Sequence, residues 1–175
     1  MEISYSTHWP QFFTATIHEW KHLLRHDEQK DIIINSLKFL VDNKRINLYA
    51  YSIMSSHLHL IWQPQATHNP KDIQASFLRH TGKQLFRSLE YHPRFNINDF
   101  KVNRFDRAYQ IWKRDALSIG LISAPVFNQK LEYIHYNPVK AGLCISIEEY
   151  RYSSARYYMD GIDEFSILTH YSGIS

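Results

Sequence analysis

Cysteine and glycine are both scarce in this chain of 175 residues. The single cysteine, Cys144, excludes a disulfide within the chain and any zinc site built on a C-x-x-C pair. Among only 5 glycines, neither of the patterns G-x-G-x-x-G and G-x-x-x-x-G-K occurs, and these are the patterns that cradle nucleotide phosphates. The sequence therefore argues against a disulfide scaffold and against a glycine-rich nucleotide site.

Long apolar runs are missing as well. No run approaches the ~20 residues that span a bilayer, and the N-terminus lacks a signal-peptide pattern. We therefore expect a cytoplasmic protein with no membrane partner. The length and the 44% apolar content predict one domain over residues 1–175, with 150–175 as a C-terminal tail. The net charge of +3 permits a nucleic-acid partner without demanding one.

The hydrophobic periodicity predicts a mixed order of strands and helices. Strands are expected at residues 12–17, 46–53, 57–63 and 109–113, and helices at 27–43, 71–90 and 125–137. Residues 91–108 read as irregular, basic and aromatic. This order is typical of an α+β sandwich, in which helices pack mainly on one face of a central antiparallel sheet.

One predicted strand carries two histidines. Side chains alternate along a strand, so His57 and His59 share one face and Leu58 points to the other. Two imidazoles about 7 Å apart along the backbone can converge on one metal ion. With 11 histidines in the chain, however, the tripeptide alone fits better a half-buried strand whose histidines are only hydrogen-bonded.

A second constellation ends the last predicted helix. Tyr133 and Asn137 are four residues apart and share a helical face. A tyrosine hydroxyl, with a pKa of about 10, is a poor nucleophile at neutral pH. Beside a divalent cation and a phosphodiester it can attack and form a covalent phosphotyrosine, and the amide oxygen of Asn137 could be a third metal ligand.

Pro138 leaves two backbone conformations open for Asn137. A proline disfavours helical backbone in the residue before it, so the helix either ends at Tyr136 or kinks at Pro138 and continues. The plainer alternative makes Tyr133 a rim residue and the pair Asn137-Pro138 a turn.

Together the two motifs resemble a known family. The histidine pair, the segment Tyr-Ile-His-Tyr-Asn-Pro-Val-Lys-Ala-Gly-Leu at 133–143 and the run Tyr-Ser-Ser-Ala at 152–155 are similar to the REP-associated tyrosine transposases. These are relatives of the single-tyrosine HUH transposases, which act on single-stranded DNA. The resemblance covers residues 9–157, and 133–143 is its most specific part.

The resemblance implies a fold, a reaction and a set of site residues. The implied fold is the ferredoxin-like HUH endonuclease domain. His57, His59 and Asn137 would bind a divalent metal, Mg²⁺ or Mn²⁺, and Tyr133 would be the nucleophile. The implied reaction cleaves single-stranded DNA through a 5′-phosphotyrosine and can run in reverse to rejoin strands. The ligand set by itself favours manganese, because imidazole suits transition metals and magnesium prefers oxygen.

The chain departs from the family pattern in two places. Ser55-Ser56 precede the first histidine, where many members have Pro-Asn or a similar pair. The segment after Trp112 lacks the aromatic or histidine residues expected there, which bears on the DNA contacts around it.

Basic and aromatic residues interleave over residues 91–114, the composition that single-stranded DNA-binding grooves use. One face of the helix at 71–90 adds further positive charge. The candidate DNA contacts are Arg79, Lys83, Arg87, Arg94, Lys101, Arg104, Arg107, Trp112, Lys113 and Arg114. The alternative for each charged residue is an ordinary solvated side chain.

Three functions remain open at this point. The first is a transposase-type enzyme that cleaves and rejoins single-stranded or hairpin DNA. The second is a catalytically inactive or domesticated hairpin-DNA-binding protein, and the third is a metal-dependent hydrolase of a small phosphoester in which Tyr133 is structural. Both a homodimer and a monomer are compatible with the sequence.

Overall fold

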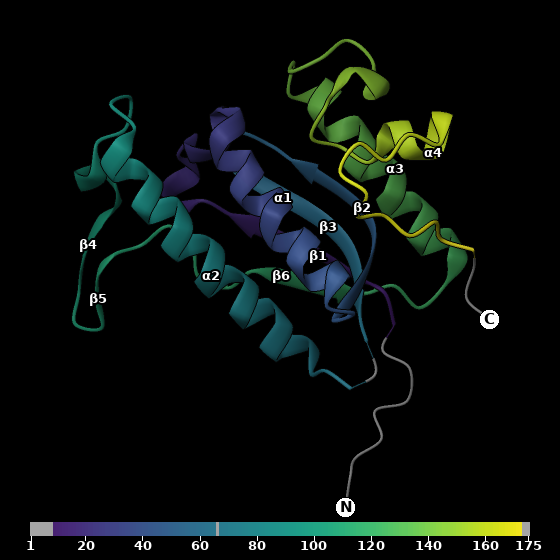
Figure 1. Ribbon diagram of the computed structural model, residues 1–175, viewed down its shortest axis with the longest axis horizontal. Helices are drawn as coiled ribbons and strands as arrows, with labels where there is room; N and C mark the ends of the chain where they lie inside the picture. Colours follow the sequence, from purple (N-terminus) through teal and green to yellow (C-terminus); the bar gives the residue numbers. More distant parts are fainter. Residues whose placement is uncertain (1–8, 66, 173–175) are drawn as a thin grey trace, which may run out of the picture.

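The computed structural model describes residues 9–65 and 67–172, and its centre is a four-stranded antiparallel sheet. The strands lie in the order β2-β3-β1-β6 (Figure 1). Their bounds are Gln11–Thr16 for β1, Ile46–Ile53 for β2, His57–Pro64 for β3 and Leu117–Gly120 for β6. The strands predicted at residues 46–53 and 57–63 are confirmed, and they pair as a hairpin with Ile53 opposite Leu58.

The outer strand β6 is not the one that the sequence predicted. Residues 109–113 were expected as a strand, but in that stretch only the end of β5 (Arg107–Tyr109) and an isolated bridge between Trp112 and Ile17 are extended pairings. Instead β6 pairs with β1, and all four of its residues are exposed. Leu117 and Ile119 alternate with Ser118 and Gly120, but the strand is only four residues long and buries no face, so the pattern was too short to indicate a strand.

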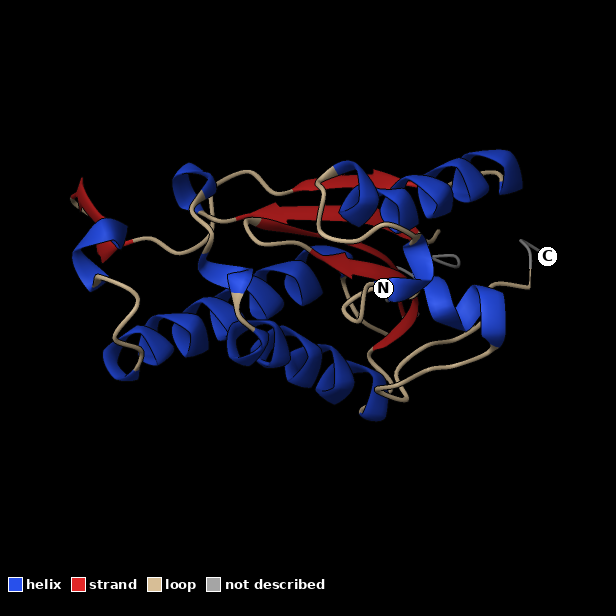
Figure 2. Cartoon of the chain, turned by 90° about the horizontal axis from the view of Figure 1, so that it is seen from above, coloured by secondary structure: helices blue, strands red, loops and turns tan. Residues whose placement is uncertain are grey.

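Helices cover both faces of the sheet. Helices α1 (Asp27–Asp42) and α2 (Pro70–Tyr91) contact each other and pack on one face, as expected, whereas α3 (Ala124–Lys140) covers the other (Figure 2). The adjacent residues Leu60 and Ile61 show why, because both are fully buried and point to opposite faces. Each face therefore needs a cover of its own.

Several short elements complete the described chain. Three single-turn 3₁₀ helices, η1 (His18–Trp20), η2 (Leu23–Arg25) and η4 (Ile147–Glu149), lie in loops. The region predicted as irregular holds a fourth, η3 (Ile97–Phe100), followed by a protruding hairpin of β4 (Lys101–Arg104) and β5.

Helix α3 does not end before its proline. It runs to Lys140, with Asn137 in helical register and its carbonyl accepting from the Ala141 amide at 3.0 Å. Gly142, two residues after the end of α3, has a φ of 71°, a conformation that glycine adopts without steric cost. The helix therefore continues past Pro138 and does not end at Tyr136.

The segment after residue 150 covers the edge of β2. The Ile53 amide donates to the Tyr152 carbonyl at 2.9 Å, and the Thr169 amide donates to the Leu48 carbonyl at 2.8 Å. Within this segment α4 (Ala155–Asp160) forms, and the Tyr152 side chain is buried in the core. Of the helices in the described ranges, none is both long enough and apolar enough to cross a membrane.

Candidate active site

The two histidines of β3 lie on the sheet face that α3 covers. Alternation places His57 and His59 on the side of Ile61, which packs against Phe127 and Ile134 of α3. The two imidazole rings are 4.9 Å apart between centroids. The β-strand therefore brings both rings into one site, as the sequence predicted.

The His59 ring is held in place on several sides. It stacks on Phe12 at 5.5 Å, and its Nδ1 is 2.8 Å from Oγ1 of Thr14, its pairing partner on β1. Its Nε2 is buried and has no hydrogen-bond partner among the residues that the structure describes. Burial, helped by the charges of His57 and Lys130, lowers the pKa of His59 to about 3. The imidazole is therefore neutral at physiological pH.

His57 is half-buried at the outer end of the same face. Its Nδ1 lies 3.2 Å from Oγ of Ser56, and the Trp20 ring meets it edge to face at 5.5 Å between centroids. Burial lowers the pKa of His57 as well. Both imidazoles can thus offer a lone pair, which is what a metal ligand requires.

Tyr133 reaches this site from α3. Its ring lies edge to face with His59 at 5.2 Å and with Phe12 at 5.9 Å, and 42% of the residue remains exposed. The structure therefore brings the tyrosine and the histidine pair together from distant parts of the chain, while leaving the tyrosine open to a ligand.

Two lysines that the sequence reasoning missed flank the tyrosine. Nζ of Lys130 is 5.7 Å from the centroid of the Tyr133 ring and 4.8 Å from that of Phe12. Nζ of Lys140 is 5.9 Å from the Tyr133 centroid. Lys130 precedes Tyr133 by three residues and Lys140 follows it by seven. Helical periodicity therefore places all three on one face, and this spacing could have predicted the two lysines.

Asn137 is one turn beyond Tyr133 on α3 and is partly buried. Its Nδ2 is buried without a hydrogen-bond partner in the described part of the chain. The ring contact between α3 and the histidine pair is made by Tyr133. Asn137 lies one turn away from that contact, and the structure does not establish it as a ligand.

The donor set fits a divalent metal. Thr14 at Nδ1 of His59 is the kind of hydrogen-bond partner that orients a metal-binding imidazole, and the unpartnered Nε2 is the atom left to bind. In residues 9–65 and 67–172, no three side chains of His, Cys, Asp or Glu cluster closely enough to hold an ion. Two imidazoles would therefore need an amide, phosphate oxygens or water to complete the coordination.

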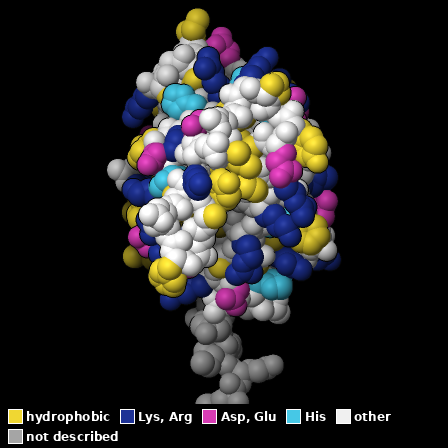
Figure 3. All heavy atoms as spheres, turned by 90° about the vertical axis from the view of Figure 1, so that its left-hand side faces the viewer, with side chains coloured by type: hydrophobic (Ala, Val, Ile, Leu, Met, Phe, Trp, Pro, Cys, Tyr) yellow, Lys and Arg dark blue, Asp and Glu magenta, His cyan; other side chains and the backbone are white. Residues whose placement is uncertain are grey.

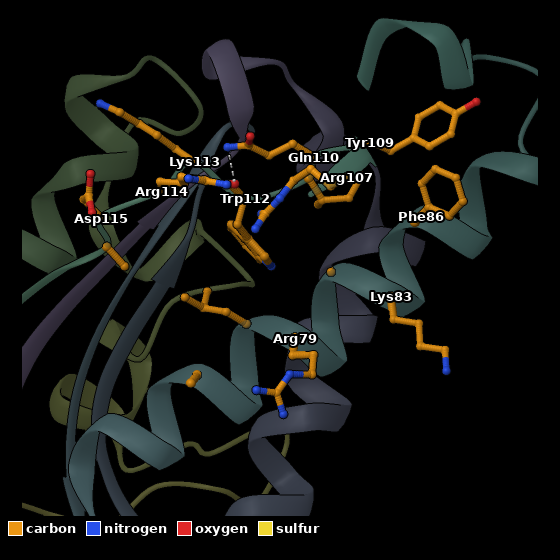
Figure 4. Close-up of a pocket in the computed structure, with 15 residues that line it drawn as sticks. Arg79, Lys83, Phe86, Arg107, Tyr109, Gln110, Trp112, Lys113, Arg114 and Asp115 are labelled. Atoms are coloured by element: carbon orange, nitrogen blue, oxygen red, sulfur yellow. Dashed lines mark hydrogen bonds between the residues drawn. The ribbon is translucent and has the colours of Figure 1, made fainter. Parts of the chain in front are cut away.

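Six of the predicted DNA contacts line one cavity of about 740 Å³ between α2 and the segment 107–116 (Figure 4). They are Arg79, Lys83, Arg107, Trp112, Lys113 and Arg114. The aromatic rings of Phe86 and Tyr109 line the same cavity and pack against each other at 4.9 Å. The cavity thus combines cationic and aromatic side chains, the mixture that single-stranded nucleic acid requires.

The cavity residues differ in how free they are. Trp112 is 7% exposed, and its Nε1–H donates to Oγ1 of Thr81 at 3.0 Å, so little of the ring is open for a base to stack on. Arg107 and Arg114 both pair with Asp106, at 3.0 and 2.6 Å. The Arg107 side chain, with both arginine charges, holds the pKa of Asp106 below its usual range. A phosphate at these arginines would compete with that carboxylate.

The other four predicted contacts are dispersed and exposed. Arg87 lies one turn beyond Lys83 on α2. Lys101 and Arg104 bound β4, and Nη1 of Arg94 is 3.4 Å from Nδ1 of His26 in a separate cavity. On the side of the molecule that carries α2 and the β4–β5 hairpin, Lys and Arg side chains alternate with exposed apolar ones (Figure 3).

The remaining residues of the two motifs have a structural role. Nε2 of His135 lies 2.8 Å from Oγ of Ser154, which in turn accepts from the Tyr51 amide at 3.0 Å. This contact fastens α3, the 152–155 run and β2 together. The contact gives the segments 133–143 and 152–155 a shared structural reason to occur in one sequence pattern, and it assigns no catalytic role to His135 or Ser154.

No family model matches the sequence, and no curated protein matches it. Solved structures do match. The structure of the REP-associated tyrosine transposase bound to a REP hairpin has a TM-score of 0.63 and 16% identity, over 100% of this chain and 96% of that chain. A structure from Deinococcus radiodurans R1, described as that of a transposase, matches over 77% of this chain and 95% of that chain, with 14% identity and a TM-score of 0.48. The predicted resemblance to the REP-associated tyrosine transposases is therefore confirmed at the level of the fold.

Proposed function

We propose that this chain cleaves and rejoins single-stranded DNA at hairpin or repeat sequences, as a single-tyrosine HUH transposase does, with Tyr133 as the nucleophile. The observation that carries the proposal is that the Tyr133 ring from α3 lies 5.2 Å from the His59 ring on β3, while the His59 ring lies 4.9 Å from the His57 ring. The fold supports the choice of substrate, because the solved transposase that shares it is bound to a REP hairpin.

The reaction exchanges one phosphodiester for another. The phenolic oxygen of Tyr133 attacks the phosphorus, an Oη–P bond forms and the P–O3′ bond breaks. The phenolic proton passes to water, and the leaving 3′ oxygen takes up a proton to end as a hydroxyl. The product is a 5′-phosphotyrosine whose attack by a 3′-hydroxyl rejoins the strand without an external energy source.

The residues around Tyr133 prepare it for this step. A divalent cation, Mg²⁺ or Mn²⁺, held by His57, His59 and Asn137 would polarise the phosphoryl oxygens and orient the scissile bond. Thr14 fixes the orientation of the His59 ring. The ammonium groups of Lys130 and Lys140 lie beside the Tyr133 ring, where their positive charge would attract the phosphate of the DNA.

The part of the DNA beyond the scissile phosphate is held away from the sheet face that carries the histidines. The cavity between α2 and residues 107–116 offers cations for the phosphates and aromatic surface for the bases. Arg79 and Lys83 on α2 and Lys113 opposite them are exposed, and we assign them to phosphate contacts. We place the reaction in the cytoplasm.

A covalent-adduct assay tests the proposal. The protein is incubated with Mn²⁺ and a fluorescently labelled DNA hairpin with single-stranded flanks, taken from inverted repeats beside the coding sequence, and resolved on a denaturing gel. We expect a protein–DNA adduct that disappears in Tyr133→Phe. Tyr136→Phe is the matched control, because Tyr136 is an exposed tyrosine of the same helix, and it should form the adduct normally.

Two results would overturn the proposal. Tight hairpin binding with no adduct in any divalent metal would make the chain a DNA-binding protein that does not cut. A product released by water that persists in Tyr133→Phe would make it a metal-dependent phosphoester hydrolase.

A further inference from the structure

Trp20 is exposed beside the histidine pair. The residue is 56% exposed, although its ring forms a T-shaped contact with the His57 imidazole, with the centroids 5.5 Å apart and an interplanar angle of 70°. An indole of this size is normally well buried. More than half of the Trp20 surface is thus accessible next to the site where we place the scissile phosphate.

The backbone that presents Trp20 has an uncommon conformation. Glu19 and Trp20 have φ angles of 55° and 57°, in the left-handed region that non-glycine residues seldom occupy. Such residues persist where surrounding structure fixes them, often at ligand-binding positions. Here the Trp20 amide donates to the Ile17 carbonyl at 2.9 Å, and the His18 amide donates to the Ile111 carbonyl at 2.7 Å. The loop is therefore fastened to the segment that forms the DNA cavity.

A second cavity joins Trp20 to that DNA cavity. It measures about 460 Å³, is lined by Trp20, Glu19 and Arg104, and shares a wall of four residues with the 740 Å³ cavity. The shared residues are Gln110, Lys113, Arg114 and Asp115.

The charged side chains that line the second cavity are compatible with a phosphate backbone. Arg104, Lys113 and Arg114 face the second cavity, against the two carboxylates of Glu19 and Asp115. The Glu19 carboxylate forms an ion pair with Lys21, so part of its charge is already neutralised. A single strand that leaves the α2 cavity along Lys113 and Arg114 would therefore reach Trp20, whose ring contacts His57.

We propose that the Trp20 ring is a stacking platform for the base next to the phosphate that Tyr133 attacks. The ligand is one unpaired nucleotide of a single strand that reaches the histidine pair through the second cavity. This subsite rests on the proposed function, because the position of the phosphate follows from the Tyr133 reaction. Its contribution is to fix which phosphate lies at the nucleophile.

Binding of a fluorescein-labelled 20-nucleotide thymidine strand tests the subsite directly. The measurement is made in EDTA, so that any effect of Trp20 on metal binding at His57 cannot contribute. Losing one base–aromatic stack should weaken binding by Trp20→Ala about five- to 150-fold, whereas Trp20→Phe should stay within about threefold of wild type. Trp9→Ala is the matched control, since Trp9 is a tryptophan of similar exposure at the far end of β1, and it should bind like wild type.

The salt dependence separates stacking from charge. Trp20→Ala should keep the wild-type slope of log affinity against log salt, whereas Lys113→Gln should reduce it by about 0.7, the value for one phosphate contact on a single strand. Wild-type affinity in Trp20→Ala, together with a normal Tyr133 adduct, would refute the subsite and leave the proposed function standing. Absence of both strand binding and adduct in the wild-type chain would refute both.

Discussion

Acidification should unfold this protein through its buried histidines. His59 and His135 are 4% and 6% exposed, and burial is the main cause that lowers their pKa values, to about 3 and about 4. An unfolded histidine has a pKa of about 6.5, so below that pH the unfolded chain binds protons that the folded chain does not. The stability that these neutral imidazoles allow is complete above pH 6.5 and is lost as the pH falls toward 4.

The size of the effect follows from these pKa values. Each histidine costs about 1.4 kcal/mol per pH unit below 6.5 until its folded pKa is reached. At pH 5.0 the loss is about 2 kcal/mol for each and about 4 kcal/mol for the pair. A domain of this size has about 5–15 kcal/mol of stability in total, so the loss is a substantial part of it.

Urea unfolding at pH 7.5 and 5.0 measures this difference. His135→Gln keeps an amide donor near Ser154 and removes the titrating group, so it should reduce the difference between the two pH values by about 2 kcal/mol. His80→Gln, which removes an exposed histidine from α2, should leave the difference as in wild type. A wild-type loss below about 1 kcal/mol, or the same loss in His135→Gln, would contradict the reasoning.

Three further substitutions test separate contacts. Thr14→Val removes the hydrogen bond to His59 and should raise the Mn²⁺ concentration needed for half-maximal adduct formation by about 10–100-fold; an unchanged metal requirement would count against a metal at His59. Thr81→Val leaves the buried Nε1–H of Trp112 unpaired and should cost about 1–3 kcal/mol in urea unfolding, with Thr81→Ser as the conservative control. Arg79→Gln should reduce the salt slope of single-strand binding by about 0.7 without changing Tyr133 adduct formation at saturating DNA; an unchanged slope would remove it from the phosphate contacts.

The elements with a buried face were predictable from the sequence. Helix α1 and the β2–β3 hairpin have regular apolar spacing because one side of each is packed, and their predicted bounds agree closely with the observed ones. The same alternation put His57 and His59 on one side of β3, and helical spacing put Tyr133 and Asn137 on one side of α3. Local periodicity does not show that these two sides face each other, and this step depended on the family resemblance.

The features that could not be predicted from the sequence depend on tertiary contacts. The strand β6 is only four residues long and buries no face, and Trp112 looks like a stacking residue until its packing against Thr81 is seen. Trp20 carried no signal at all, because its left-handed backbone and its approach to His57 arise from the path of a loop.

The segment that follows α3 also determines how the sheet can meet other chains. Backbone hydrogen bonds from residues 152–154 and 169 occupy the outer side of β2. That edge therefore does not present a row of free amide and carbonyl groups to another strand. Within the described residues, β6 is the sheet edge left open, and Leu117 and Ile119 on it are 50% and 39% exposed. Strand-to-strand association of two copies would therefore have to start at β6. Shortening the chain before residue 150 would open a second edge, and a sheet with two open edges can stack without limit and aggregate.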